Sequence, residues 1–289
     1  SRQYADVLRN AGHEVFVFAR GGESYAQGDP NWDFDWVHWG RKSLLRDSSG
    51  IDLKDFSSWL TSNSIDLVLF NEQWTWEPVL LCRELGIKTV AYIDYYKERD
   101  VSLFGAYDGL ICNTERHYSV FKWHPGAIYV PWGTDVDTFK PGGKFPALVD
   151  DQHVTFFHSA GMSPVRKGTD FLLRAFEHVK GNARLIIHSQ IDLADKMPEL
   201  SELIKRECKS GRLELISKTI SAPGLYHMGD IYVYPSRLDG IGLTVCEAMA
   251  CGLPAIVPDN GPMNEFVPSD KCGKKVQIDR LVARYDGYY

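Results

Sequence analysis

The sequence has no apolar run long enough to cross a membrane and shows no N-terminal signal peptide. It also lacks cysteine pairs at CxxC spacing, an HExxH pair, a Gly-x-Ser-x-Gly elbow and a Walker phosphate loop. These absences argue against a membrane-spanning protein, a zinc enzyme, a serine hydrolase and a P-loop nucleotidase. Its nine histidines are spread without paired ligand spacing, so we expect no metal site.

An excess of basic charge is absent as well. The chain carries 32 basic and 38 acidic side chains, a net charge of −6, which is not the electrostatic footprint of a general nucleic-acid binder. Its six cysteines are widely spread, and several lie inside apolar runs, as is typical of free thiols in a reducing compartment. We therefore expect a cytoplasmic protein with no nucleic-acid partner, and peripheral contact with a membrane surface stays open.

What the sequence does contain is a repeated alternation of short apolar strands and amphipathic helices. The expected strands are 14–19, 66–70, 88–93, 109–113, 126–132, 153–159, 184–189, 213–217, 231–235 and 254–257. Helices are expected at 77–85, 168–180 and 243–251. The buried face of the second helix is expected to be Phe171, Leu172, Ala175, Phe176 and Val179. Such alternation favours parallel sheets covered on both faces.

A break in the alternation at 138–152 has the composition of a linker. We therefore predict an α/β protein with two Rossmann-like, doubly wound parallel-sheet domains, 1–140 and 150–289, facing each other across a cleft. Ligands of such sheets bind beyond the carboxyl ends of the strands. The residues expected at those ends are Asn71, Asp94, Asn113, Ser159, Ser189 and Ser236.

The stretch 25–45 is rich in tryptophan, with Trp32, Trp36 and Trp39. Exposed indole rings there would be able to stack on a sugar. Alternatively, the loop folds back so that its aromatic side chains cover the core.

The segment "RLDGIGLTVCEAMAC", directly after the strand 231–235, carries the strongest functional signal. Gly240 and Gly242 lie at the turn into a helix, where glycine lets a ligand approach the backbone and the helix start favours phosphate. Asp239 precedes the turn, and Glu247 lies about one turn inside the helix. This order suits a nucleotide sugar, which has hydroxyls at both ends of a diphosphate.

A second segment, "SAGMSPVRKGTDFLLRAF", also runs from a strand through a glycine loop into a helix. Arg166 and Lys167 lie at the end of that loop, where two cations suit diphosphate oxygens. Glu265 follows a further strand. A single acid at a helix start is usually a cap, and a single lysine is usually a solvated charge. The joint order of two loops, the acids and the lysine at strand ends favours a binding site.

Together these segments resemble the retaining glycosyltransferases of family 4, which have the GT-B fold. That family shows an acid, a seven-residue gap and a glutamate, matched here by Asp239 and Glu247. Its glycine–lysine loop resembles "GMSPVRKG" (161–168), its inter-domain segment "VPWGTDVDTFKP" (130–141) and its glycine–glutamate turn "GPMNE" (261–265). The likeness is strong across 130–267, whereas in 1–129 only the alternation and "AGHEV" agree.

The resemblance implies transfer of a sugar from a nucleotide-diphosphate sugar to a hydroxyl of a carbohydrate, lipid-linked or small-molecule acceptor, without metal or other cofactor. Glu247 would hold the ribose, Asp239 the donor-sugar hydroxyls and Lys167 the leaving diphosphate, while Asp94 would serve the acceptor. The implied donor-binding set is Gly161, Arg166, Lys167, Asp239, Gly240, Ile241, Gly242, Leu243, Thr244, Glu247 and Glu265. The oligomeric state is not set by these motifs.

The sequence departs from the family pattern at several points. The first acid is Asp239 instead of the usual glutamate, and Met162 replaces an arginine whose charge Arg166 is a candidate to supply. Ile93 and Asp94 stand where the family often has a histidine. The first strand, expected before Ser1, and the terminal helices are missing from the pattern. A nucleotide-sugar epimerase, a phosphorylase and a non-catalytic nucleotide-sugar or glycan-binding subunit remain alternatives.

Overall fold

The computed structural model describes residues 2–20, 27–30, 32–41, 50–71, 75–94, 96–142 and 153–282. These residues form two compact units. The first holds the chain up to Asn113 and His117–Val130, and the second holds Thr114–Arg116 and the chain from Pro131 onward. Among the described residues, no helix has the length and apolarity that a membrane span requires. Most of the expected linker at 138–152 lies outside the described residues.

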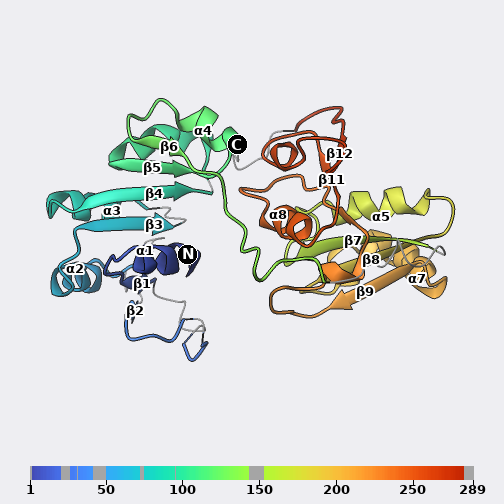
Figure 1. Ribbon diagram of the computed structural model, residues 1–289, viewed down its shortest axis with the longest axis horizontal. Helices are drawn as coiled ribbons and strands as arrows, with labels where there is room; N and C mark the ends of the chain where they lie inside the picture. The colour runs from blue at the N-terminus through green and yellow to red at the C-terminus, as the bar shows by residue number, and fades with distance from the viewer. Residues whose placement is uncertain are drawn as a thin grey trace. The chain divides into compact units, whose positions relative to one another are not determined.

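Short parallel strands and their connecting helices build the first unit (Figure 1). One sheet pairs β1 (Val17–Ala19) with β2 (Val37–Trp39). The other has the order β3 (Leu67–Asn71), β4 (Lys88–Ile93), β5 (Gly109–Cys112) and β6 (Ala127–Tyr129). The helices are α1 (Arg2–Asn10), α2 (Leu53–Ser62), α3 (Glu77–Glu84), the 3-10 helix η2 (Glu98–Ala106) and α4 (Glu115–Phe121), of which the first two residues, Glu115 and Arg116, belong to the second unit.

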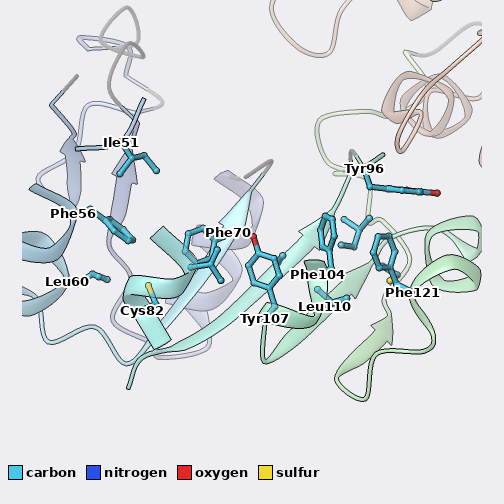
Figure 2. Close-up of a cluster of buried hydrophobic side chains, with 14 of the residues drawn as sticks. Ile51, Phe56, Leu60, Phe70, Cys82, Tyr96, Phe104, Tyr107, Leu110 and Phe121 are labelled. Carbon is cyan, nitrogen blue, oxygen red and sulfur yellow. The ribbon is translucent and has the colours of Figure 1, made fainter. Parts of the chain in front are cut away.

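The core of the first unit is strongly aromatic, as Figure 2 shows for Phe56, Phe70, Phe104, Tyr107 and Phe121. Several of these rings meet edge to face, a geometry that adds to the stabilisation from burial. Trp32, Trp36 and Trp39 of the stretch 25–45 are partly buried and lie outside this core cluster. Trp36 stacks on Phe34 with ring centroids 5.1 Å apart, and the guanidinium of Arg9 lies 5.0 Å from its ring. The Trp36 ring thus packs on Phe34 and Arg9 of its own unit, and the role of the three tryptophans stays a prediction.

The second unit has a six-stranded sheet with the order β12-β11-β10-β7-β8-β9. Its strands are β7 (Val154–Gly161), β8 (Ala183–Ser189), β9 (Leu213–Ser217), β10 (Ile231–Val233), β11 (Ala255–Pro258) and β12 (Gly273–Val276). Its helices are α5 (Thr169–Glu177), α6 (Leu193–Lys196), η4 (Pro198–Leu200), α7 (Ser201–Lys209), η5 (Tyr226–Met228), α8 (Leu243–Ala250) and η6 (Met263–Phe266). All neighbouring strands pair in parallel, so the predicted α/β class with parallel sheets is confirmed.

Both faces of this sheet are buried, each under its own cluster of apolar side chains. Successive side chains of a strand point to opposite faces, so each strand contributes to both clusters. On β8, Leu185 and Ile187 pack in the cluster that includes α5 and α7, whereas Ile186 packs in the cluster that includes α8. On β10, Tyr232 and Val233 divide in the same way. This accounts for the continuous apolar runs from which the strands were predicted.

The expected buried face of α5 is wrong in part. Leu172 and Phe176 are buried as expected, but Leu173 replaces Phe171 and Ala175 on the buried side. Phe171 is 51% exposed, and the guanidinium of Arg237 lies 3.5 Å from the centroid of its ring. The prediction that Phe171 is buried rested on its apolar character alone. In the structure Phe171 forms a cation–π contact at the surface instead.

Candidate functional site

The predicted donor-binding loops both leave the sheet of the second unit at its topological switch point. In chain order the strands lie as 6-5-4-1-2-3, and the first and fourth of them, β7 and β10, are hydrogen-bonded neighbours. Their connections run in opposite directions, through α5 to β8 and through α8 to β11. In doubly wound sheets the space beyond the carboxyl ends of such a strand pair is where ligands bind.

The loop that carries Lys167 is held close to the neighbouring strand by a glycine. Gly168 has a φ of +72°, and a Cβ built on it would lie 1.9 Å from the carbonyl oxygen of Pro235. Glycine is required there because any side chain would collide with backbone. Gly168 is also the N-cap of α5, and as a glycine it supplies no side-chain cap. The glycine thus brings Lys167, one residue earlier, against the segment that follows β10.

Lys167 and Asp239 form an ion pair, and the Tyr234 hydroxyl is hydrogen-bonded to both of them. The Lys167 ammonium donates to Asp239 Oδ2 and to the Tyr234 hydroxyl, which itself donates to Asp239 Oδ2. The side chains of Lys167 and Asp239 are each only 14% exposed. Burial raises the pKa of Asp239, but the charge of Lys167 and the hydrogen bonds from Lys167 and Tyr234 outweigh it, so the pKa lies below its usual value. Asp239 is therefore a carboxylate at neutral pH.

Arg166 adds a second positive charge to this group. Its guanidinium Nη1 lies 3.8 Å from Asp239 Oδ2 and donates to the carbonyl oxygen of Leu238 at 3.0 Å. Met162, which stands where the resemblance leads one to expect an arginine, is 71% exposed. The structure thus places the Arg166 charge beside Asp239.

The turn into α8 is shaped by Gly242, which has a φ of +72° and serves as N-cap without a side-chain cap. A Cβ built there would lie 2.4 Å from the terminal methyl of Met263. Of the neighbouring predicted residues, Ile241 is buried at 4% exposure and Leu243 is 40% exposed. Gly242 has no side chain with which to cap the first N–H groups of α8, an arrangement that favours an anion.

Glu247 lies one turn inside α8 and is held by a tyrosine. The hydroxyl of Tyr226, from η5, donates to Glu247 Oε2 at 2.5 Å. Burial raises the pKa of Glu247, and this hydrogen bond offsets only part of that effect. Glu247 is therefore an acceptor without a cationic partner among the described residues, unlike Asp239.

Glu265 is bound by backbone N–H groups of its own unit. Its carboxylate accepts from Glu115 N at 2.7 Å and from Arg116 N at 2.9 Å, while the Arg116 guanidinium donates to the Gly261 carbonyl at 2.8 Å. Burial raises the pKa of Glu265 more than these bonds lower it. The role of Glu265 near the donor stays a prediction.

Asp94 belongs to the other unit, where it directly follows β4 and is half-buried. Its acceptor role stays a prediction too. Within the described ranges, no group of three or more His, Cys, Asp or Glu side chains is arranged to hold a metal ion.

Sequence reasoning missed three residues that support the site, namely Tyr226, Tyr234 and His158. His158 on β7 is fully buried, with Nδ1 2.8 Å from the Val233 carbonyl and Nε2 2.8 Å from Thr169 Oγ1. Since a carbonyl only accepts, Nδ1 carries the proton and Nε2 accepts from Thr169. Burial lowers the pKa of His158 to about 4, so the ring is neutral.

His158 therefore ties β7, β10 and the first residue of α5 together beneath the Lys167 loop. A signal for His158 and Tyr234 was present in the sequence, whereas Tyr226 lies in η5, outside the predicted strands. "TFFHS" and "IYVYP" place polar tips inside buried strands, where such tips need partners.

The sequence pattern of the family described as glycosyl transferases group 1 matches residues 153–285. The lipopolysaccharide core biosynthesis mannosyltransferase LpsB of Rhizobium meliloti is 36% identical over 91 residues, 30% of this chain and 26% of that protein. The D-inositol 3-phosphate glycosyltransferase of Xylanimonas cellulosilytica is 27% identical over 159 residues, 50% of this chain and 37% of that protein. The chain thus spans well under two thirds of the length of these relatives.

Solved structures show the fold over most of the chain. A glycosyltransferase from Rickettsia africae superposes with a TM-score of 0.77 at 15% identity, covering 96% of this chain and 79% of that one. Anabaena Alr3699/HepE in complex with UDP and glucose gives a TM-score of 0.63 at 17% identity, covering 83% and 72%. At these identities the likeness establishes the fold.

Proposed function

Because this chain belongs to the glycosyl transferases group 1 family through residues 153–285 and has the GT-B fold, we propose that it is a retaining glycosyltransferase. It would move a sugar from a nucleotide-diphosphate sugar to an acceptor hydroxyl. The observation that carries the proposal is the buried group of Lys167, Asp239 and Tyr234 at the switch point, beside the uncapped start of α8. Retention of configuration follows from the family resemblance.

The contacts of the two acids support a division of labour between them. Among the described residues, the hydrogen bonds and ion pairs of Asp239 are made through Oδ2, which leaves Oδ1 to accept from a sugar hydroxyl. Glu247 is bound through Oε2, which leaves Oε1 for a ribose hydroxyl. The diphosphate between them would meet Lys167, Arg166 and the N–H groups at the start of α8.

In the proposed step, the bond between the anomeric carbon and the diphosphate oxygen breaks, and the acceptor oxygen bonds to that carbon. The acceptor proton passes to an oxygen of the departing diphosphate. Lys167, with Arg166, stabilises the negative charge that develops there, because fixed charges in a partly buried site act with little solvent screening. The nucleoside diphosphate then leaves.

The class of acceptor and the base of the donor nucleotide are proposed more broadly, as classes of molecule. The printed names of the relatives include lipopolysaccharide core, D-inositol 3-phosphate and phosphatidylinositol mannoside acceptors, so we propose a carbohydrate, lipid-linked or small-molecule acceptor. UDP occupies related structures, and GDP-mannose is named for a relative. All six cysteines are free thiols, which supports a reducing compartment such as the cytoplasm.

The test is nucleotide binding by calorimetry with UDP, GDP and ADP, followed by turnover of the matching nucleotide sugars with and without acceptors. We expect Lys167→Met and Asp239→Asn each to abolish transfer. Arg237→Gln is the matched control, because Arg237 is a cation in the same loop as Asp239 that instead pairs with Asp170 at 2.6 Å.

The outcomes separate the alternatives. Conversion of the donor sugar to an isomer without acceptor would identify an epimerase, and binding without turnover would identify a binding subunit. If Lys167→Met and Asp239→Asn retained full transfer, the proposed site would be wrong.

A further inference from the structure

Three buried tyrosines line one face of the sheet beneath the two acids. Tyr226, Tyr232 and Tyr234 are 6%, 0% and 0% exposed. The centroids of the Tyr226 and Tyr232 rings are 5.8 Å apart, as are those of Tyr232 and Tyr234. Tyr232 and Tyr234 share a face because they are two positions apart along one extended segment. The rings are fixed by this packing, so their hydroxyls have fixed positions.

The outer two hydroxyls each bind one acid. Tyr226 donates to Glu247 Oε2 at 2.5 Å, and Tyr234 donates to Asp239 Oδ2. The middle hydroxyl, that of Tyr232, binds neither acid among the described residues and lies near the Thr244 side chain and the Ser159 backbone. Burial raises the pKa of Tyr226 and Tyr234, so both phenols keep the proton that they donate.

We propose that Tyr226 and Tyr234 are positioning residues that each hold one acid by a single oxygen, so that Glu247 Oε1 and Asp239 Oδ1 face the donor. The inference rests on the proposed function and extends it to residues outside the donor-binding set. A carboxylate on a flexible side chain would otherwise have to be ordered when the donor binds, at a cost in affinity or rate. Donors and acceptors fixed before the reaction are the more effective ones.

The two tyrosines are expected to act on different quantities. Tyr226 holds the ribose acid, so Tyr226→Phe should weaken nucleoside diphosphate binding about tenfold and leave kcat within about twofold. Tyr234 holds the acid that meets the sugar, so Tyr234→Phe should lower kcat about tenfold or more. Its effect on nucleoside diphosphate binding should stay within about threefold, because that ligand has no sugar to contact Asp239 and because Lys167, which loses its bond to the Tyr234 hydroxyl, keeps its ion pair with Asp239.

Tyr232→Phe is the matched control. It removes a buried hydroxyl from the same row of rings, but one that binds neither acid. All three changes keep the ring and its packing, and near-ultraviolet circular dichroism would confirm that each variant folds. We expect Tyr232→Phe to match the wild type both in the Kd for nucleoside diphosphate and in kcat.

The experiment measures the Kd of UDP, or of whichever diphosphate the wild type binds, together with kcat and KM for the nucleotide sugar. Equal behaviour of the three variants, with an active wild type, would overturn the positioning role alone and leave the proposed function standing. The positioning role would also be overturned if Tyr226→Phe and Tyr234→Phe each lowered kcat and affinity to the same extent. A general structural role predicts that both quantities fall together in both variants. A folded wild type that neither binds nor turns over any nucleotide sugar would refute the proposed function and this inference with it.

Discussion

Replacing Gly168 with alanine tests how the site is built. Gly168 has a φ of +72°, and an added Cβ would lie 1.9 Å from the Pro235 carbonyl oxygen and 2.7 Å from its carbon. The obstacle is backbone, which cannot move aside as the end of a flexible side chain can. Gly161, at the other end of the same loop, has a φ of +56° but nothing within 4 Å of the added Cβ.

The two substitutions therefore separate backbone strain from collision. An L-residue in the left-handed region costs about 1–2 kcal/mol, partly offset by about 0.4–1 kcal/mol because alanine restricts the unfolded chain. Gly161→Ala should thus destabilise by about 1 kcal/mol. The collision at Gly168 adds a cost of the kind seen on overpacking, about 1–3 kcal/mol, so Gly168→Ala should destabilise by about 2–4 kcal/mol.

The assay has to report on the second unit. All eight tryptophans lie at or before Trp132, so tryptophan fluorescence follows mainly the first unit. We would measure urea unfolding by hydrogen exchange of peptides that cover β7 and β10, for the wild type and both variants. If Gly168→Ala cost no more stability than Gly161→Ala, the close approach of the Lys167 loop to Pro235 would be refuted.

Three further predictions concern charge and pH. The folded-state pKa of His158 is about 4 against about 6.5 when unfolded, so the unfolded chain takes up the proton first as pH falls. Stability should therefore decline by about 3 kcal/mol between pH 6.5 and 4, and His158→Gln should remove most of that decline in urea titrations at several pH values. An ordinary glutamate titrates near pH 4.3. Because the pKa of Glu247 is raised, we expect nucleotide affinity to fall already at a higher pH than that as the pH is lowered. Calorimetry with Glu247→Gln should show weaker binding and a flatter pH dependence, whereas an unchanged dependence would contradict this role. Arg237→Gln breaks the ion pair with Asp170, in which the Arg237 side chain is 34% exposed. It should lower the free energy of unfolding by less than about 1 kcal/mol, as measured by thermal unfolding. A larger loss of stability would show that the pair stabilises the loop.

Local patterns in the sequence predicted much of the architecture. Strand–helix alternation identified the parallel sheets, because a strand buried on both faces leaves a continuous apolar run and its connecting helix an amphipathic one. The glycines at 161, 168 and 242 were identified as loop positions, and all three have positive φ in the structure. Phe171 shows the limit of such patterns, since its apolar side chain covers the surface beside Arg237 and not the core.

The sequence by itself determined which chemical groups are available: two acids, a lysine and an arginine, each in the loop or helix that follows a strand. Only the tertiary structure decided which of them meet and how each is held. The Lys167–Asp239 pair joins positions 72 residues apart, and the Tyr226–Glu247 bond joins positions 21 apart. Local periodicity carries no information about such contacts, and the Lys167–Asp239 pair arises because the parallel order brings β7 beside β10. The strand order thus turned separate motifs into one site, and the buried tyrosines fixed the orientation of its two acids.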